Sequence, residues 1–136
     1  IPEVLSYKEI LQFQAITSEV VVSRELAAYC ADLARATRPA EPGASEWLTK
    51  VVEWGAGPRA GQSLIGVAKA MAAMDGRPAI VSDDIREALD PVFRHRIACN
   101  YAAQANHVSS QQVVDMLLES VPTDRSYERP KSVERV

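Results

Sequence analysis

The sequence is poor in the residues that build metal sites and disulfide frameworks. Its 136 residues include two histidines and two cysteines, Cys30 and Cys99, which stand far apart. No CxxC pair or Cys/His cluster occurs, so the sequence predicts no metal site. Cys30 lies on an apolar stripe with helical spacing, which predicts a buried, reduced thiol.

Aromatic side chains and long apolar runs are also scarce. Aromatic residues make up 6% of the chain and hydrophobic residues 47%, so most apolar side chains are Ala, Val, Leu and Ile. Because alanine loses no side-chain entropy in a helix, this composition favours helices over strands. No apolar run approaches the roughly 18 residues that a membrane span needs, and we therefore expect none.

Positive charge is in slight deficit. Fifteen lysines and arginines face eighteen aspartates and glutamates, which gives a formal net charge of −3. A dedicated nucleic-acid-binding domain normally carries a basic footprint, so we expect no nucleic-acid partner. A single basic face around Arg94 and Arg96 keeps a helical nucleic-acid binder open as the weakest hypothesis.

Capping residues and apolar spacing predict an all-α fold, a small helical bundle with at most short extended segments. Ser6 and Ser23 each precede a stretch of helical periodicity, and Glu9 completes a capping box with Ser6. The predicted helices cover residues 7–16, 24–37, the stretch from Pro58 to a Gly76 cap, the stretch after a Ser82 cap and the stretch between Ser109 and Pro122. Shorter candidates are 46–53, as helix or extended turn, and 102–106.

The strongest apolar stripe lies in the helix that starts at Pro58. Proline suits the first helical position because its missing N–H would be unpaired there anyway. The residues that recur at steps of four and three, and that we expect to face the core, are Ala60, Leu64, Val67, Met71 and Met74.

Short extended segments and the end of the chain complete the expected layout. Residues 20–22 are β-branched, so we expect them to end the first helix or to pair locally. Residues 78–81 have the pattern of a short extended stretch. Beyond residue 122 apolar content falls and charge rises, which predicts a folded domain over 1–122 and a flexible tail or linker over 123–136.

The turn GAGPRA at residues 55–60 is the feature that best suits an external ligand. A helix N-terminus offers unpaired N–H groups and partial positive charge to an anion. Arg59 adds a guanidinium whose fork matches phosphate oxygens, and Gly55 and Gly57 permit close backbone approach. The alternative is an ordinary exposed arginine in a first turn, where positive charge is mildly unfavourable. The local pattern leaves both open.

Two further arginine clusters are weaker candidates. Arg94 and Arg96 flank His95 near a helix end, where they could hold a phosphate or a neighbouring carboxylate. We favour the simpler interpretation, in which they complement the negative helix C-terminus. Arg38 and Arg35 flank the end of another helix, and we expect them to form surface or interface ion pairs.

Two pairs of residues could be mistaken for functional sites. Asp83 and Asp84 directly follow a capping serine, which is far more often a helix start than a metal or acid–base site. Trp47 and Trp54 bracket a short segment and could form a partner-binding surface, although we favour their packing against the bundle.

The motifs of phosphoryl transfer are missing from the sequence. There is no GxxxxGK[ST] phosphate loop and no apolar strand that ends in paired acidic residues. Nothing in the sequence would position Mg²⁺ or activate a water for attack on a phosphate, so we expect no catalytic residues here. HExxH and GxSxG motifs are absent as well.

Several motifs nevertheless follow one another in a characteristic order. They are a YxxxLxxATR helix, a GxxPRA turn, a long Ala/Leu helix closed by a GR pair, a VSDDI cap and a V[LF]xHR ending. With these motifs the sequence resembles the C-terminal lid of MoxR-type AAA+ ATPases, from about Val4 to Pro122. The combination is specific, although each motif alone is weak, and one departure is Gly57 where the family more often has Ser.

The resemblance implies a function that this chain performs only with other domains. Arg59, next to Pro58 and Gly57, looks like the sensor-2 arginine, which reaches ATP held with Mg²⁺ by a core domain outside this chain. Arg38 and Arg96 also match family positions. The chain alone, without Walker motifs, is then expected to be inactive.

The resemblance also implies partners and a location. Family members form cytoplasmic ring oligomers, usually hexamers, that act as chaperone-like remodellers. Their partners include von Willebrand factor A proteins and other clients, in some cases with metal insertion. The alternative is a free-standing helical interaction module that uses the Trp47–Trp54 segment.

Overall fold

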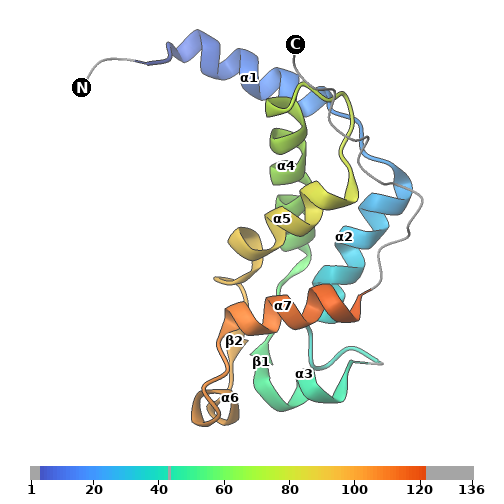
Figure 1. The fold of residues 1–136 in the computed structure, drawn as a ribbon, viewed down its shortest axis with the longest axis vertical. Coiled ribbons are helices and arrows are strands. Elements are labelled where there is room, and N and C mark those ends of the chain that lie inside the picture. The colour runs from blue at the N-terminus through green and yellow to red at the C-terminus, as the bar shows by residue number, and fades with distance from the viewer. Residues whose placement is uncertain (1–3, 43, 122–136) are drawn as a thin grey trace, which may run out of the picture.

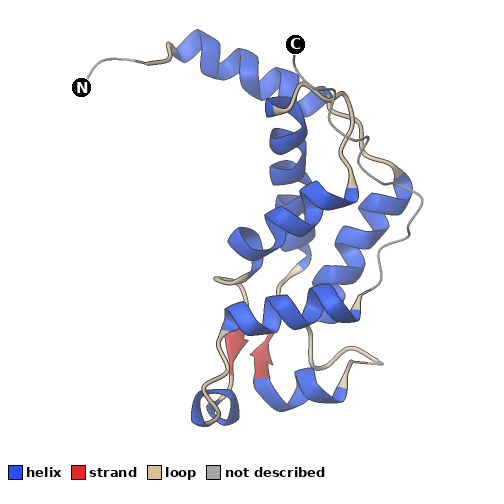
Figure 2. Cartoon of the chain, in the orientation of Figure 1, coloured by secondary structure: helices blue, strands red, loops and turns tan. Residues whose placement is uncertain are grey.

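The computed structural model describes residues 4–42 and 44–121 (Figure 1). Figure 2 shows that helices dominate this part of the chain and that two short strands lie at one end, so the predicted all-α bundle is confirmed. The elements, in chain order, are α1 (Tyr7–Glu19), α2 (Arg24–Ala36), α3 (Glu46–Val51), β1 (Val52–Trp54), α4 (Pro58–Met74), α5 (Ser82–Phe93), β2 (Ala98–Cys99), α6 (Tyr101–Ala105) and α7 (Ser110–Ser120).

Serine caps start three helices at the predicted positions. At α1, the Ser6 hydroxyl accepts the Glu9 N–H at 3.3 Å, and the Glu9 carboxylate accepts the Ser6 N–H at 2.7 Å. Ser109 and Gln112 form the same reciprocal box at α7, and Ser23 caps α2 by accepting the Leu26 N–H. These caps satisfy backbone donors that have no partner inside the helix, which is why the starts of these helices are visible in the sequence.

The start of α5 corrects a predicted cap. Ser82 is the first helical residue, and the N-cap is Val81, whose side chain has no oxygen. The carboxylate of Asp84 accepts the Val81 N–H at 2.8 Å instead. Asp84, in the first turn of α5, therefore provides the cap that the sequence predicted for Ser82.

The buried side of α4 also differs from the prediction. Ala60 and Leu64 are buried as expected, but Val67 is 37% exposed and Met74 is 77% exposed. Burial continues through Ala68 and Ala72 at steps of four. These small side chains allow α2 and α5 to pack closely against α4 (Figure 1). Val67 and Met74 point away from the core, whereas Met71 is partly buried against it.

The short extended segments pair with each other across the fold. Helix α1 ends at Glu19, just before residues 20–22, as one of the two expectations had it. Val21 forms an isolated parallel bridge with Ala79, which is a distant rather than a local partner. The candidate helix at 46–53 is divided into α3 and β1, and β1 pairs antiparallel with β2.

Three further predictions concern a membrane span, a metal site and the end of the chain. Within residues 4–42 and 44–121, no helix has both the length and the apolarity needed to cross a bilayer. The same described ranges contain no group of three or more His, Cys, Asp or Glu that could hold a metal ion. The predicted tail at 123–136, and the proline expected to stop the last helix, lie outside the described residues.

The two cysteines should differ sharply in reactivity. Cys30 is fully buried in the core, and burial raises the pKa of its thiol to about 12. Cys99 is half-buried on β2. Because the thiolate is the reactive form, we expect iodoacetamide to modify Cys99 in the native protein and to spare Cys30 until denaturation. Peptide mass spectrometry measures this, and equal native labelling of both would contradict it.

Candidate functional site

The first turn of α4 presents Arg59 to solvent. Gly57 is the N-cap, with an extended backbone and no side chain to cap the helix, and Pro58 occupies the first helical position as predicted. Arg59 is exposed, and no hydrogen bond or ion pair links its guanidinium to another residue that the structure describes. An uncapped helix start and an unpaired guanidinium thus lie together, and both favour an anion.

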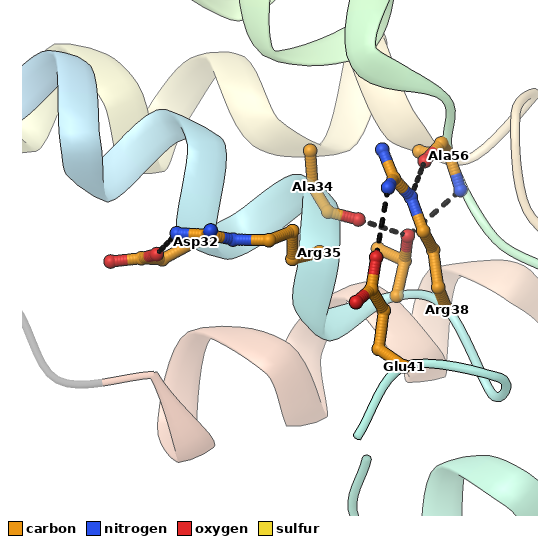
Figure 3. Close-up of polar contacts among 7 residues, drawn as sticks. Asp32, Ala34, Arg35, Arg38, Glu41 and Ala56 are labelled. Atoms are coloured by element: carbon orange, nitrogen blue, oxygen red, sulfur yellow. Dashed lines mark hydrogen bonds and ion pairs between the residues drawn. The ribbon is translucent and has the colours of Figure 1, made fainter. Parts of the chain in front are cut away.

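Ala56, just before this turn, is held through both of its backbone groups (Figure 3). Its N–H donates to the Thr37 hydroxyl at 2.8 Å, and its carbonyl accepts the Nε–H of Arg38 at 3.0 Å. Thr37 is fully buried, and its hydroxyl donates to the Ala34 carbonyl at 2.7 Å. The C-terminal end of α2 therefore fixes the backbone from which Arg59 projects.

Gly55 allows this close approach of the two segments. A Cβ at this position would lie 2.2 Å from the Thr37 carbonyl oxygen and 2.8 Å from the Arg38 Cα. A Cβ at Gly57 would meet nothing within 4 Å. The predicted close backbone approach is therefore correct for Gly55, where the neighbour is the end of α2 rather than a ligand.

Arg38 and Arg35 make contacts within the domain (Figure 3). Besides its bond to Ala56, Arg38 donates to the Glu41 carboxylate at 3.0 Å, and its side chain is 28% exposed. Arg35 pairs with Asp32 on the outer surface of α2. The expected ion pairs thus form within one chain, and Arg38 also fixes the backbone at Ala56.

Arg94 and Arg96 lie at the C-terminal end of α5. Arg96 donates to the Val92 carbonyl and contacts the ring Nε2 of His95 at 2.7 Å. Arg94 lies 3.7 Å from the Asp90 carboxylate. These contacts fit the favoured interpretation, in which the arginines complement the last turn of the helix.

Sequence analysis missed the ion pair between Arg77 and Asp84. Asp84 is 1% exposed, and its two oxygens accept bonds from Arg77 at 2.6 and 2.8 Å. This bidentate bonding to Asp84 raises the pKa of Arg77 above its already high ordinary value. Arg77 also donates to Asp75 at 3.0 Å, so it ties the end of α4 to the start of α5. The available signal was an arginine directly after the Gly76 cap.

Trp47 and Trp54 have different surroundings. Trp47 packs against the core cluster, whereas Trp54 on β1 is 71% exposed. The segment that they bracket therefore presents one exposed indole to a partner, and single exposed apolar residues are common on protein surfaces.

Comparisons with known proteins place the chain among ATPase lids. A family model described as "AAA lid domain" matches residues 47–117. The chain is 30% identical to Chaperone MoxR1 of Mycobacterium tuberculosis over 119 residues, which are 88% of this chain and 32% of that protein. It also matches the crystal structure of a Cytophaga hutchinsonii protein classed as an ATPase, with 33% identity and a TM-score of 0.82.

The second match covers 90% of this chain and 37% of the Cytophaga chain. The chain therefore spans about a third of the length of the relatives that it matches. These similarities extend well beyond residues 47–117, and they confirm the predicted resemblance to MoxR-type lids.

Proposed function

Because the chain belongs to the AAA lid domain family, we propose that it is the nucleotide-sensing lid of a cytoplasmic MoxR-type AAA+ ATPase, with Arg59 as its sensor-2 arginine. The observation that carries this proposal is the exposed guanidinium of Arg59, which stands at a helix start without a side-chain cap and has no bonded partner among residues 4–42 and 44–121. Arg38, Arg77 and Arg96, by contrast, are each bonded within the bundle.

The described residues suit the phosphates of ATP. Arg59 offers a planar fork that pairs with two phosphate oxygens, and the first turn of α4 adds partial positive charge. ATP and Mg²⁺ would be held mainly by a core domain outside this chain, which would also supply the chemistry of hydrolysis. The role of this chain is then to bind and report the phosphate.

The two hydrogen bonds that fix the Ala56 backbone support a mechanical role for the lid. Thr37 and Arg38 connect the end of α2 to the backbone before Arg59, so a pull on the guanidinium would be transmitted to two helices. A charge-assisted hydrogen bond contributes roughly 1.5–3 kcal/mol, which changes the equilibrium constant between two lid positions by about 10- to 100-fold. Hydrolysis would remove this bond and release the lid.

The same proposal includes the assembly and its clients. By the family resemblance, the intact ATPase forms a ring, with a hexamer expected, and remodels partner proteins. A von Willebrand factor A domain protein is one expected partner. The relative from Mycobacterium tuberculosis is named as a chaperone, which supports this class of activity.

Arg59→Ala in the intact ATPase tests the assignment. We expect ATP turnover to fall by about tenfold or more, which corresponds to the loss of one charge-assisted hydrogen bond. The thermal midpoint of the lid should stay unchanged, because Arg59 has no bonded partner among the described residues. Arg94→Ala is the matched control, since Arg94 is also exposed. Near-normal turnover in Arg59→Ala would rule the assignment out.

The interaction-module hypothesis is the alternative, and it now depends on Trp54 alone. It predicts that Trp54→Ala abolishes capture of a protein partner and that capture needs no nucleotide. Pull-down with and without ATP separates the two functions, because remodelling by an ATPase lid requires nucleotide.

A further inference from the structure

The peptide between Ala56 and Gly57 is the joint at which the chain enters α4. Its carbonyl, on Ala56, accepts the Nε–H of Arg38, and Gly57 is the N-cap of the helix. A Cβ added at Gly57 would meet no described atom within 4 Å, so packing does not restrain this residue. Glycine also has the widest choice of backbone angles. The bond from Arg38 therefore holds the peptide on which the start of α4 can turn.

Arg59 lies two residues beyond this joint, in the first turn of α4. The first turn closes through the Ala60 N–H, which donates to the Gly57 carbonyl at 2.9 Å. Backbone donors in a first turn have no partner inside the helix, and helix ends fray unless another group holds them. Because Gly57 supplies no side-chain cap, the direction in which Arg59 projects depends on the peptide that Arg38 holds.

The two bonds to Ala56 differ in their surroundings. Thr37 is fully buried, and its hydroxyl both accepts the Ala56 N–H and donates to the Ala34 carbonyl. A buried hydroxyl with both partners satisfied supports the fold itself. The side chain of Arg38 is 28% exposed, and it binds the peptide that is nearer to Arg59. Loss of the Thr37 bond should therefore destabilise the domain, whereas loss of the Arg38 bond should loosen the helix start.

The guanidinium of Arg38 is itself held by Glu41. Its Nη1 donates to the Glu41 carboxylate at 3.0 Å while its Nε donates to the Ala56 carbonyl at 3.0 Å. Figure 3 shows both bonds leaving one planar group in different directions. A guanidinium makes two such bonds at fixed angles, whereas a lysine ammonium has no rigid fork. Glu41 thus keeps the Nε of Arg38 aimed at the Ala56 carbonyl.

We propose that Arg38 is a positioning residue for Arg59 in nucleotide sensing and that it acts through the Ala56 carbonyl. Glu41 supports this role by fixing the guanidinium of Arg38. Arg38 itself would touch neither ATP nor the reacting atoms. A side chain whose backbone is already held loses less freedom when it binds, so positioning strengthens the contact between Arg59 and a phosphate. The inference rests on the proposed function, because it needs a phosphate at Arg59.

Arg38→Lys in the intact ATPase tests the role through turnover. Lysine keeps the positive charge but cannot bind Ala56 and Glu41 together, so we expect ATP turnover to fall roughly tenfold through misplacement of Arg59. The preference for ATP over ADP in equilibrium binding should fall with it. Added to Arg59→Ala, the lysine substitution should cause no further loss of turnover, because it acts only through Arg59.

Arg35→Lys is the matched control for this substitution. It makes the same change on the outer surface of α2, where a lysine can still pair with Asp32. Turnover and the preference for ATP over ADP should both stay unchanged in this variant. A loss that appears with Arg38→Lys and not with Arg35→Lys therefore comes from the contacts of Arg38.

A second measurement does not depend on turnover. In the nucleotide-free ATPase, the Ala60 amide reports on the first turn of α4, because it donates to the Gly57 carbonyl. Its hydrogen exchange should become roughly tenfold faster in Arg38→Lys, and faster by a smaller factor in Glu41→Ala, which leaves the bond to Ala56 in place. Amides in the middle of α4 should keep their protection, because the lid remains folded.

The remaining outcomes separate this inference from the sensor assignment. Unchanged exchange at Ala60 in Arg38→Lys would overturn the positioning role, and so would loss of protection throughout α4, since Arg38 would then support the fold. A further loss of turnover when Arg38→Lys is added to Arg59→Ala would also overturn it, because Arg38 would then act independently. Near-normal turnover in Arg59→Ala alone would instead refute the sensor assignment, and with it the need to position Arg59.

Discussion

Gly55→Ala is expected to destabilise the domain by about 3 kcal/mol or more. The added Cβ would lie 2.2 Å from the Thr37 carbonyl oxygen and 2.5 Å from its carbonyl carbon. Both are backbone atoms, so no side chain can rotate away to relieve the overlap. The segments must separate, and that movement breaks the hydrogen bonds that hold Ala56.

Gly57→Ser provides the matched control for this substitution. A Cβ at Gly57 meets nothing within 4 Å, and serine is a preferred N-cap residue. Its effect on the free energy of unfolding should be a few tenths of a kcal/mol, and stabilising. Urea unfolding followed by circular dichroism measures both variants. Equal midpoints for Gly55→Ala and the parent would refute the close approach of Gly55 to the end of α2.

Asp84→Ala has the second large expected effect, a loss of about 3–5 kcal/mol of stability. Asp84 is buried, and its carboxylate binds both the Arg77 guanidinium and the Val81 N–H. Removing the carboxylate leaves the Val81 N–H without its acceptor and takes the bidentate partner from Arg77, which keeps the more exposed Asp75 carboxylate. The connection between α4 and α5 and the first turn of α5 are thus weakened together.

Two comparisons isolate this ion pair. Asp83→Ala removes a carboxylate from the same helical turn without breaking the pair with Arg77, and it should cost roughly 0.3–1 kcal/mol through the helix dipole. The double variant Arg77→Met with Asp84→Leu should recover the part of the loss that comes from breaking the ion pair, whereas the Val81 N–H still lacks its acceptor. Thermal unfolding gives the coupling energy, and additive effects of the two single substitutions would contradict the bidentate contact.

The basic pH range offers an independent check on the same pair. Hydrogen bonding to Asp84 raises the pKa of Arg77 in the folded state. A group whose pKa is raised by folding stabilises the native state until the pH reaches its unfolded-state pKa, which for arginine is far above neutral. The contribution of Arg77 to the free energy of unfolding should therefore stay constant between pH 6 and 10.

Features governed by local hydrogen bonds could be predicted from the sequence. Ser6, Ser23 and Ser109 cap their helices because a serine oxygen and the backbone donor three residues later are neighbours in any helix. Pro58 starts α4 for an equally local reason. The position of Arg59 at a helix start, and with it the candidate site, could therefore be located before the fold was known.

Features that depend on distant segments could not be predicted in this way. The bond between Thr37 and Ala56 joins residues 19 positions apart, and nothing local indicates it. Val67 and Met74 were assigned to the core by hydrophobicity, yet close helix packing selected the alanines of α4 instead.

The hydrogen bonds that Thr37 and Arg38 form with Ala56 affect where the chain can change in length. Because the two ends of the stretch 39–54 are joined at its base, this stretch forms a closed excursion from the bundle. Lengthening such an excursion costs little, since loop entropy grows only with the logarithm of length. Insertions in the loop before α3 can therefore be accommodated while Arg59 keeps its place, provided that Leu48 and Val52 remain in the core.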